Sequence, residues 1–205
     1  LACEINESSL ISKASLETLA PLVPADIDYE SNIDLLGVAF NAAVVNKFNK
    51  NGDGMDTATA VKYADNFIHK PTNIEHDKQK IVGHIAGAGY SEFGSNRLIT
   101  IEEAKNTKEP FNIALGAVLY KTVNENFTTL VEKSLDPDDS AFQKVSASWE
   151  VGFNDYVLAV GSDVLSEATI ISDPDKILEL QGFLRSYGGN GTTDEGESIH
   201  RLIVG

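Results

Sequence analysis

The chain has 205 residues, of which 42% are hydrophobic and 23% charged, so it can form one folded domain with a sizeable core. Its net charge of -15 argues against broad contact with nucleic acid, because binding a phosphate backbone requires clustered Lys and Arg. The single cysteine, Cys3, excludes an internal disulfide and a CxxC motif. No apolar run approaches the roughly 20 residues needed to cross a bilayer, and no secretory signal is visible. We therefore expect a soluble, acidic, intracellular domain that contacts no membrane.

Strand-like and helical patterns alternate along the first two thirds of the chain. Residues 33–46 are a long apolar run that predicts a strand, and residues 49–56 are a turn rich in Asn, Gly and Asp. Residues 56–69 have apolar positions at helical spacing after a plausible cap, Asp56 or Thr57. The runs 80–93 and 96–101, joined through Gly-Ser-Asn, predict a hairpin. Apolar residues on one helical stripe within 109–135 predict a long helix or two shorter ones.

Three strand-like runs follow at 144–153, 155–161 and 167–172, and residues 173–187 predict a last helix. The fold class is therefore α+β, a mostly antiparallel sheet or small β-barrel surrounded by helices. We expect residues 1–31 to form an N-terminal arm or propeptide-like segment and residues 32–187 to form the main domain. Residues 188–205, which are rich in Gly, Thr and acidic residues, are expected to be a flexible tail.

The run 144–153 contains two serines, Ser146 and Ser148, whose hydroxyls would point to the same side of a strand. A serine nucleophile needs a base, usually a His with an ordinary pKa near ~6.5, and a group that orients the base. His76 is the best base, because it lies between a predicted helix and a predicted strand, where it can be held firmly and stay accessible. The candidate orienting acids are Glu75, Asp77, Glu150 and Glu167, of which Glu167 stands out as a lone carboxylate in a strand-like run.

Three blocks in this order, "NIEHDKQKIVGHI", "KVSASWEVGF" and "LSEATIISDP", resemble the signature blocks of the prohead (capsid maturation) serine proteases of tailed bacteriophages, relatives of the herpesvirus assembly proteases. The resemblance covers roughly residues 33–175. It implies Ser146 as nucleophile, His76 as base and Glu167 as orienting acid. It also implies an endopeptidase that cleaves scaffold, core and capsid proteins, and itself, inside the viral procapsid in the host cytoplasm.

The second block departs from the family pattern, because Ser148 stands where the family usually has Gly after Ser-x. Ser148 is therefore the alternative nucleophile. A non-catalytic capsid or core structural protein on the same fold is the alternative function, and a homo-oligomer is left open.

No cofactor or metal is expected. The spacing of His69, His76 and His84 matches no metal-ligand pattern, and no Gly-rich phosphate loop is present. "NKNGDGMDTATA" resembles a calcium loop, but its twelfth position is Ala60 where an EF-hand needs Glu. A calcium-stabilised binding module is thus the weaker third hypothesis.

Overall fold

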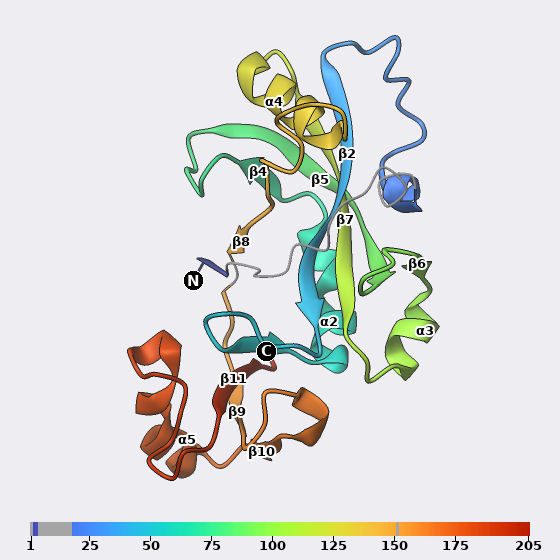
Figure 1. Ribbon diagram of the computed structural model, residues 1–205. Coiled ribbons are helices and arrows are strands. Elements are labelled where there is room, and N and C mark those ends of the chain that lie inside the picture. The colour runs from blue at the N-terminus through green and yellow to red at the C-terminus, as the bar shows by residue number, and fades with distance from the viewer. Residues whose placement is uncertain (1, 4–17, 151) are drawn as a thin grey trace.

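A computed structural model of the chain describes residues 2–3, 18–150 and 152–205. It is an α+β structure with mostly antiparallel strands in two sheets that lie one above the other in Figure 1. The five-stranded sheet, here called the large sheet, forms the upper half, and a four-stranded C-terminal sheet forms the lower half. The described strands close no barrel, and one strand pair of the four-stranded sheet is parallel, so the predicted class is confirmed as a mixture of helices and open, mostly antiparallel sheets.

The large sheet has the strand order β2 (Leu35–Val45), β7 (Phe111–Tyr120), β5 (Ile81–Glu92), β4 (Pro71–Asn73), and β6 (Leu98–Ile99) pairs with β5. All of these pairs are antiparallel. β7 is the central strand and is buried along almost its whole length, which explains its nearly continuous apolar sequence. The predicted strand at 33–46 and the predicted hairpin are both confirmed.

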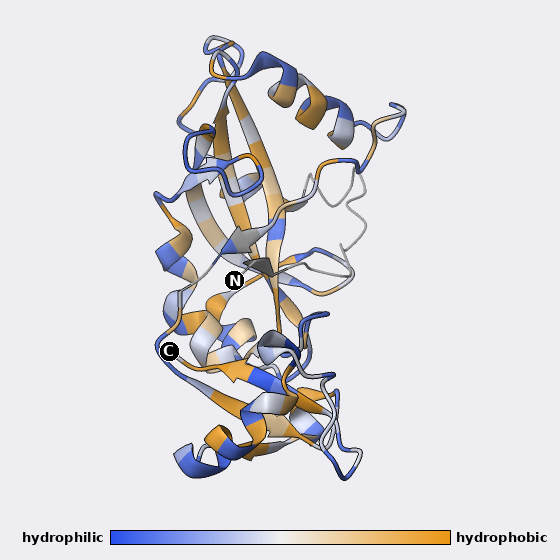
Figure 2. Cartoon of the chain, turned by 90° about the vertical axis from the view of Figure 1, so that its left-hand side faces the viewer, coloured by the Kyte–Doolittle hydropathy of each residue, from blue (hydrophilic) through white to orange (hydrophobic). Residues whose placement is uncertain are grey.

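Short helices surround the large sheet, and its apolar strands are visible through the centre of Figure 2. α2 (Thr57–Tyr63) begins at Asp56, whose side chain accepts a hydrogen bond from the Thr59 N–H, as the capping prediction required. The 3-10 helix η2 (Ala64–Phe67) continues it, and α3 (Ile101–Asn106) begins with a capping box at Thr100. α4 (Glu125–Leu135) lies beside one end of the sheet, and η1 (Ala20–Leu22) packs near its middle.

The C-terminal sheet has the order β10 (Thr169–Ile171), β9 (Tyr156–Val160), β11 (Ile199–Ile203), β3 (Asp53–Met55). The prediction that 188–205 is a flexible tail is wrong, because β11 is fully buried between β9 and β3. The Gly-rich turn before β11 dominates the composition of this segment, which is why the sequence pattern predicts a tail and not a strand. η3 (Leu165–Glu167), α5 (Pro174–Leu180), η4 (Gln181–Phe183) and η5 (Arg185–Tyr187) complete this half.

Two further element predictions are corrected. Residues 109–135 do not form one helical region, because their first half is strand β7 and only Glu125–Leu135 is helical. Among the described residues of the predicted strand 144–153, only β8 (Trp149–Glu150) is a strand, and it pairs with β1 (Ala2–Cys3) outside both sheets. About half of the expected N-terminal arm, residues 1 and 4–17, lies outside the described residues. In the part of the chain that the structure describes, no helix is both long and apolar enough to cross a membrane.

Candidate active site

His76 is held in a tight turn between β4 and β5. The turn is closed by the Asp77 N–H, which donates to the Ile74 carbonyl at 3.0 Å. Glu75 and His76 both have left-handed backbone conformations, with φ of 52° and 58°. Each such non-glycine residue costs roughly 1–2 kcal/mol, and costs of this kind concentrate at functional sites. The turn therefore presents the imidazole at a local energetic cost.

Asp77 belongs to the same turn and stabilises its second half. Its carboxylate accepts a hydrogen bond from the Gln79 N–H at 2.9 Å and forms an ion pair with Lys80 at 3.1 Å. These contacts lower the pKa of the Asp77 carboxyl, the Gln79 N–H most of all. Asp77 is thus engaged with the turn backbone, and no contact joins it to the His76 ring among the described residues.

The serine segment is anchored by the end of α4. The buried Ser134 accepts two hydrogen bonds from this segment. The Ser134 carbonyl accepts from the Gln143 N–H at 2.9 Å, and the Ser134 hydroxyl accepts from the Val145 N–H at 2.9 Å. Val145 also packs against the main core. These contacts fix the chain three residues before Ser148. Ser134 was missed in the sequence, because a serine on a helix gives no sign that its hydroxyl holds a distant loop.

The structure brings His76 and Ser148 together across 72 positions of sequence. His76 Nε2 and Ser148 Oγ are 3.0 Å apart, which is hydrogen-bonding distance. The pair lies on the wall of a cleft of about 1060 Å³, bounded by the large sheet, α4 and the 143–154 segment. Apolar side chains of the sheet and of α4 line much of this cleft, among them Phe40, Val82, Leu119, Phe127 and Val131.

Ser146 and Glu167 are placed differently from the expectation. Ser146 lines the same cleft and is exposed, but the His76 ring is hydrogen-bonded to Ser148 and not to Ser146. The geometry therefore favours Ser148, the alternative nucleophile, over Ser146. Residues 144–148 are not a strand, so the alternation argument for two hydroxyls on one side does not apply. Glu167 lies in η3 beside the C-terminal sheet, where it accepts a hydrogen bond from Ser162 Oγ at 3.3 Å.

The other acids named beside Glu167 do not orient His76 either. Glu75 is exposed within the turn, and Glu150 lines the cleft from β8. Ser148 is the one hydrogen-bond partner of the His76 ring among residues 2–3, 18–150 and 152–205. The arrangement is a Ser–His pair without a carboxylate third member in the described part of the chain.

The calcium-loop residues have structural roles. The Asn49 side-chain oxygen accepts from the N–H groups of Asn51 and Asp53, each at 2.9 Å, which makes an Asx-type turn. The Asp53 carboxylate is engaged with Arg201 Nε at 2.7 Å. Across the residues that the structure describes, no group of three or more His, Cys, Asp and Glu side chains is arranged to hold a metal ion.

Comparison of the chain with family models, with curated protein sequences and with solved structures finds no match. The functional argument therefore depends on the site geometry and on the three sequence blocks.

Proposed function

We propose that the protein is a serine endopeptidase in which Ser148 is the nucleophile and His76 is the general base. The observation that carries this proposal is the 3.0 Å distance between His76 Nε2 and Ser148 Oγ at the wall of a large cleft. A nucleophile within hydrogen-bonding reach of a base is the minimal arrangement for covalent acyl transfer. The strained turn that presents His76 adds support, because the fold retains it at a local cost.

The chemistry of the pair would follow the usual course for a serine hydrolase. With the imidazole proton on Nδ1, the Ser148 hydroxyl donates to His76 Nε2. Ser148 Oγ attacks the peptide carbonyl while the hydroxyl proton passes to Nε2, and the imidazolium then gives that proton to the leaving amine. An acyl ester forms on Ser148, and water, deprotonated by His76, releases the new carboxyl end.

The substrate proposal comes from the sequence resemblance. The three blocks that contain His76, Ser148 and Glu167 resemble those of prohead proteases, which favours scaffold, core and capsid proteins inside a viral procapsid as substrates. Ser148, the serine that the geometry favours, lies in the same block but at the position where the family usually has Gly, so the resemblance supports the substrate class and not the choice of serine. The second candidate function is a non-catalytic capsid or core protein on this fold, and the observation that favours it is that the described residues supply no acid to His76.

A fluorophosphonate probe, which reacts covalently with an activated serine, separates the two functions without a known substrate. The wild type and Ser146→Ala are expected to gain one phosphonyl group at residue 148, which is the mass of one probe less the HF that leaves. Ser148→Ala is expected to gain none. His76→Asn, which tolerates the left-handed backbone of residue 76, is expected to react at least about 10²-fold more slowly, the usual contribution of a general base.

Ser146→Ala is the matched control, since it removes a hydroxyl from the same exposed segment. Labelling of Ser148→Ala but not of Ser146→Ala would overturn the choice of nucleophile. No labelling of the folded wild type would favour the structural protein. Circular dichroism on each variant shows whether a loss of labelling reflects unfolding.

A further inference from the structure

β8 begins at the residue after Ser148 and has one strand partner within residues 2–3, 18–150 and 152–205. β1 pairs with it antiparallel, with Ala2 opposite Glu150 and Cys3 opposite Trp149 (Figure 1). This two-stranded unit is separate from both larger sheets. An extended backbone segment is therefore already bound along the strand that leads away from the candidate nucleophile.

The register gives this segment a direction. β8 runs away from Ser148, so an antiparallel segment on β8 runs toward it. A docked peptide in the register of β1 has one residue opposite Glu150 and the next opposite Trp149. The residue after these is then directed toward Ser148, which precedes β8. The residues that pair with β8 therefore lie on the N-terminal side of the peptide bond that reaches the hydroxyl. When a peptide binds by adding a strand to an exposed strand, the main-chain hydrogen bonds give affinity and pockets for alternate side chains give selectivity.

The cleft supplies the matching pocket. Successive side chains of an extended peptide point to opposite sides, so every second one can enter the cleft. The cleft surface that the large sheet and α4 contribute is largely apolar, with Phe40, Leu119 and Phe127 among its side chains. This favours peptides with apolar residues at alternate positions before the cleaved bond.

We propose, building on the endopeptidase function, that β8 is the docking strand for substrate peptides. The peptide adds antiparallel to β8, its C-terminal end directed toward Ser148, and the strand Ala2–Cys3 occupies this place in the free protein. The N-terminal strand and the substrate therefore compete for the same backbone groups. A two-residue strand pair is marginal by itself, so a longer peptide with side chains in the cleft displaces it.

The test measures binding without catalysis. A fluorescein-labelled peptide with the sequence of residues 1–8 is titrated, by fluorescence anisotropy, into two forms of the Ser148→Ala chain: the full chain and a chain that lacks residues 1–3. The peptide is expected to bind the shortened chain about tenfold more tightly, the effect of removing a competitor with one or two net hydrogen bonds.

The matched control is the same peptide with N-methyl groups on the amides of its second and third residues. One residue of each consecutive pair directs its N–H to the neighbouring strand, so methylating both removes the donor whichever it is. Binding to the shortened chain is expected to be lost. Equal affinity for both chains, or unchanged binding of the methylated peptide, would overturn the proposal.

Failure of this proposal is separable from failure of the endopeptidase function. One outcome is peptide binding that is competitive and sensitive to methylation, with no fluorophosphonate labelling of the wild type. This outcome would support peptide docking at β8 and refute the proposed peptide hydrolysis. Labelling at Ser148 without competition between the peptide and residues 1–3 would support Ser148 as the nucleophile and refute β8 as the docking strand.

Discussion

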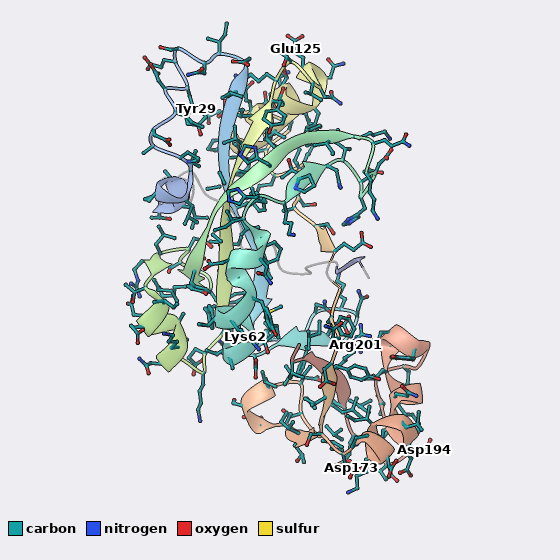
Figure 3. All side chains as sticks on the ribbon, turned by 180° about the vertical axis from the view of Figure 1, so that it is seen from behind. Tyr29, Lys62, Glu125, Asp173, Asp194 and Arg201 are labelled. Carbon is teal, nitrogen blue, oxygen red and sulfur yellow. The ribbon has the colours of Figure 1, made fainter. Side chains whose placement is uncertain are left out.

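The ion pair between Asp53 on β3 and Arg201 on β11 joins the last strand of the C-terminal sheet to the strand that follows β2 along the chain. Arg201 Nε lies 2.7 Å from Asp53 Oδ1, and each side chain is 3% exposed. The guanidinium also lies over the rings of Phe153 and Tyr156, 4.8 and 5.8 Å from their centroids. Figure 3 shows Arg201 at the end of the C-terminal sheet that faces the rest of the molecule.

Asp53→Asn removes the negative charge and leaves a buried guanidinium without its counter-charge. Loss of one partner of a buried pair costs about 3–5 kcal/mol in unfolding free energy. We expect the lower end, about 3 kcal/mol, because the two aromatic faces continue to stabilise the cation. For a chain of this size that loss lowers Tm by roughly 6–12 °C.

The assay is urea unfolding followed by circular dichroism, with the midpoint and slope fitted for each variant. Glu102→Gln is the matched control, because it breaks an exposed pair with Lys105 (3.0 Å, 71% exposed on the Glu side) and is expected to cost less than about 1 kcal/mol. The double variant Asp53→Leu with Arg201→Met is expected to recover most of the loss, since an apolar pair removes both buried charges. A loss for Asp53→Asn no greater than that of the control would refute the reasoning.

Three further changes test other parts of the structure. Glu75→Gly is expected to raise the unfolding free energy by about 0.5–1 kcal/mol, since glycine adopts φ of 52° without strain, and urea unfolding measures this. Gly116→Ala is expected to cost at least about 1–3 kcal/mol, because its Cβ would lie 2.0 Å from a backbone oxygen of η1, whereas Gly182→Ala meets no atom within 4 Å and serves as the control. Asp163→Asn is expected to reduce the part of the unfolding free energy that is lost in acid. The hydrogen bond from His200 lowers the pKa of the Asp163 carboxyl in the folded protein. The contribution of the ionised carboxylate to the unfolding free energy is therefore complete above about pH 4 and is lost as the pH falls through the lower folded pKa. The difference in unfolding free energy between the wild type and Asp163→Asn should therefore be smaller at pH 2 than at pH 6, and an equal difference at both would contradict the assignment.

The elements that the sequence predicts well are those with a local physical signal. β2 is an apolar run of strand length, and α2 follows an acidic cap at Asp56. β7 was mistaken for a helix because a strand buried on both faces has apolar residues at every spacing, helical spacing included. What distinguishes it is that Gly116 lies against the backbone of Leu22, a contact between distant parts of the chain that no local pattern encodes.

The candidate site was predictable only in part, for the same reason. His76 was identified from its position between two elements, and the two serines from their unusual place in an apolar run. The choice between Ser146 and Ser148 depends on how Ser134 anchors the segment, and this long-range contact has no sequence pattern. Glu167 was chosen for its isolation in a strand-like run, but that run is on the C-terminal sheet, and the sequence does not say which sheet a strand joins.

The absence of a carboxylate beside His76 in the described residues gives the strained turn a larger part in the proposed mechanism. In a triad the acid fixes the direction of the imidazole and stabilises its charged form. Here the left-handed backbone at Glu75 and His76, with the Asp77 contacts that close the turn, can supply the first of these effects. The turn cannot stabilise the charged imidazolium, because none of these contacts places a negative charge beside the ring. A Ser148–His76 pair of this kind should therefore react with an activated phosphonate more readily than it hydrolyses a peptide, whose amine leaving group needs the imidazolium proton.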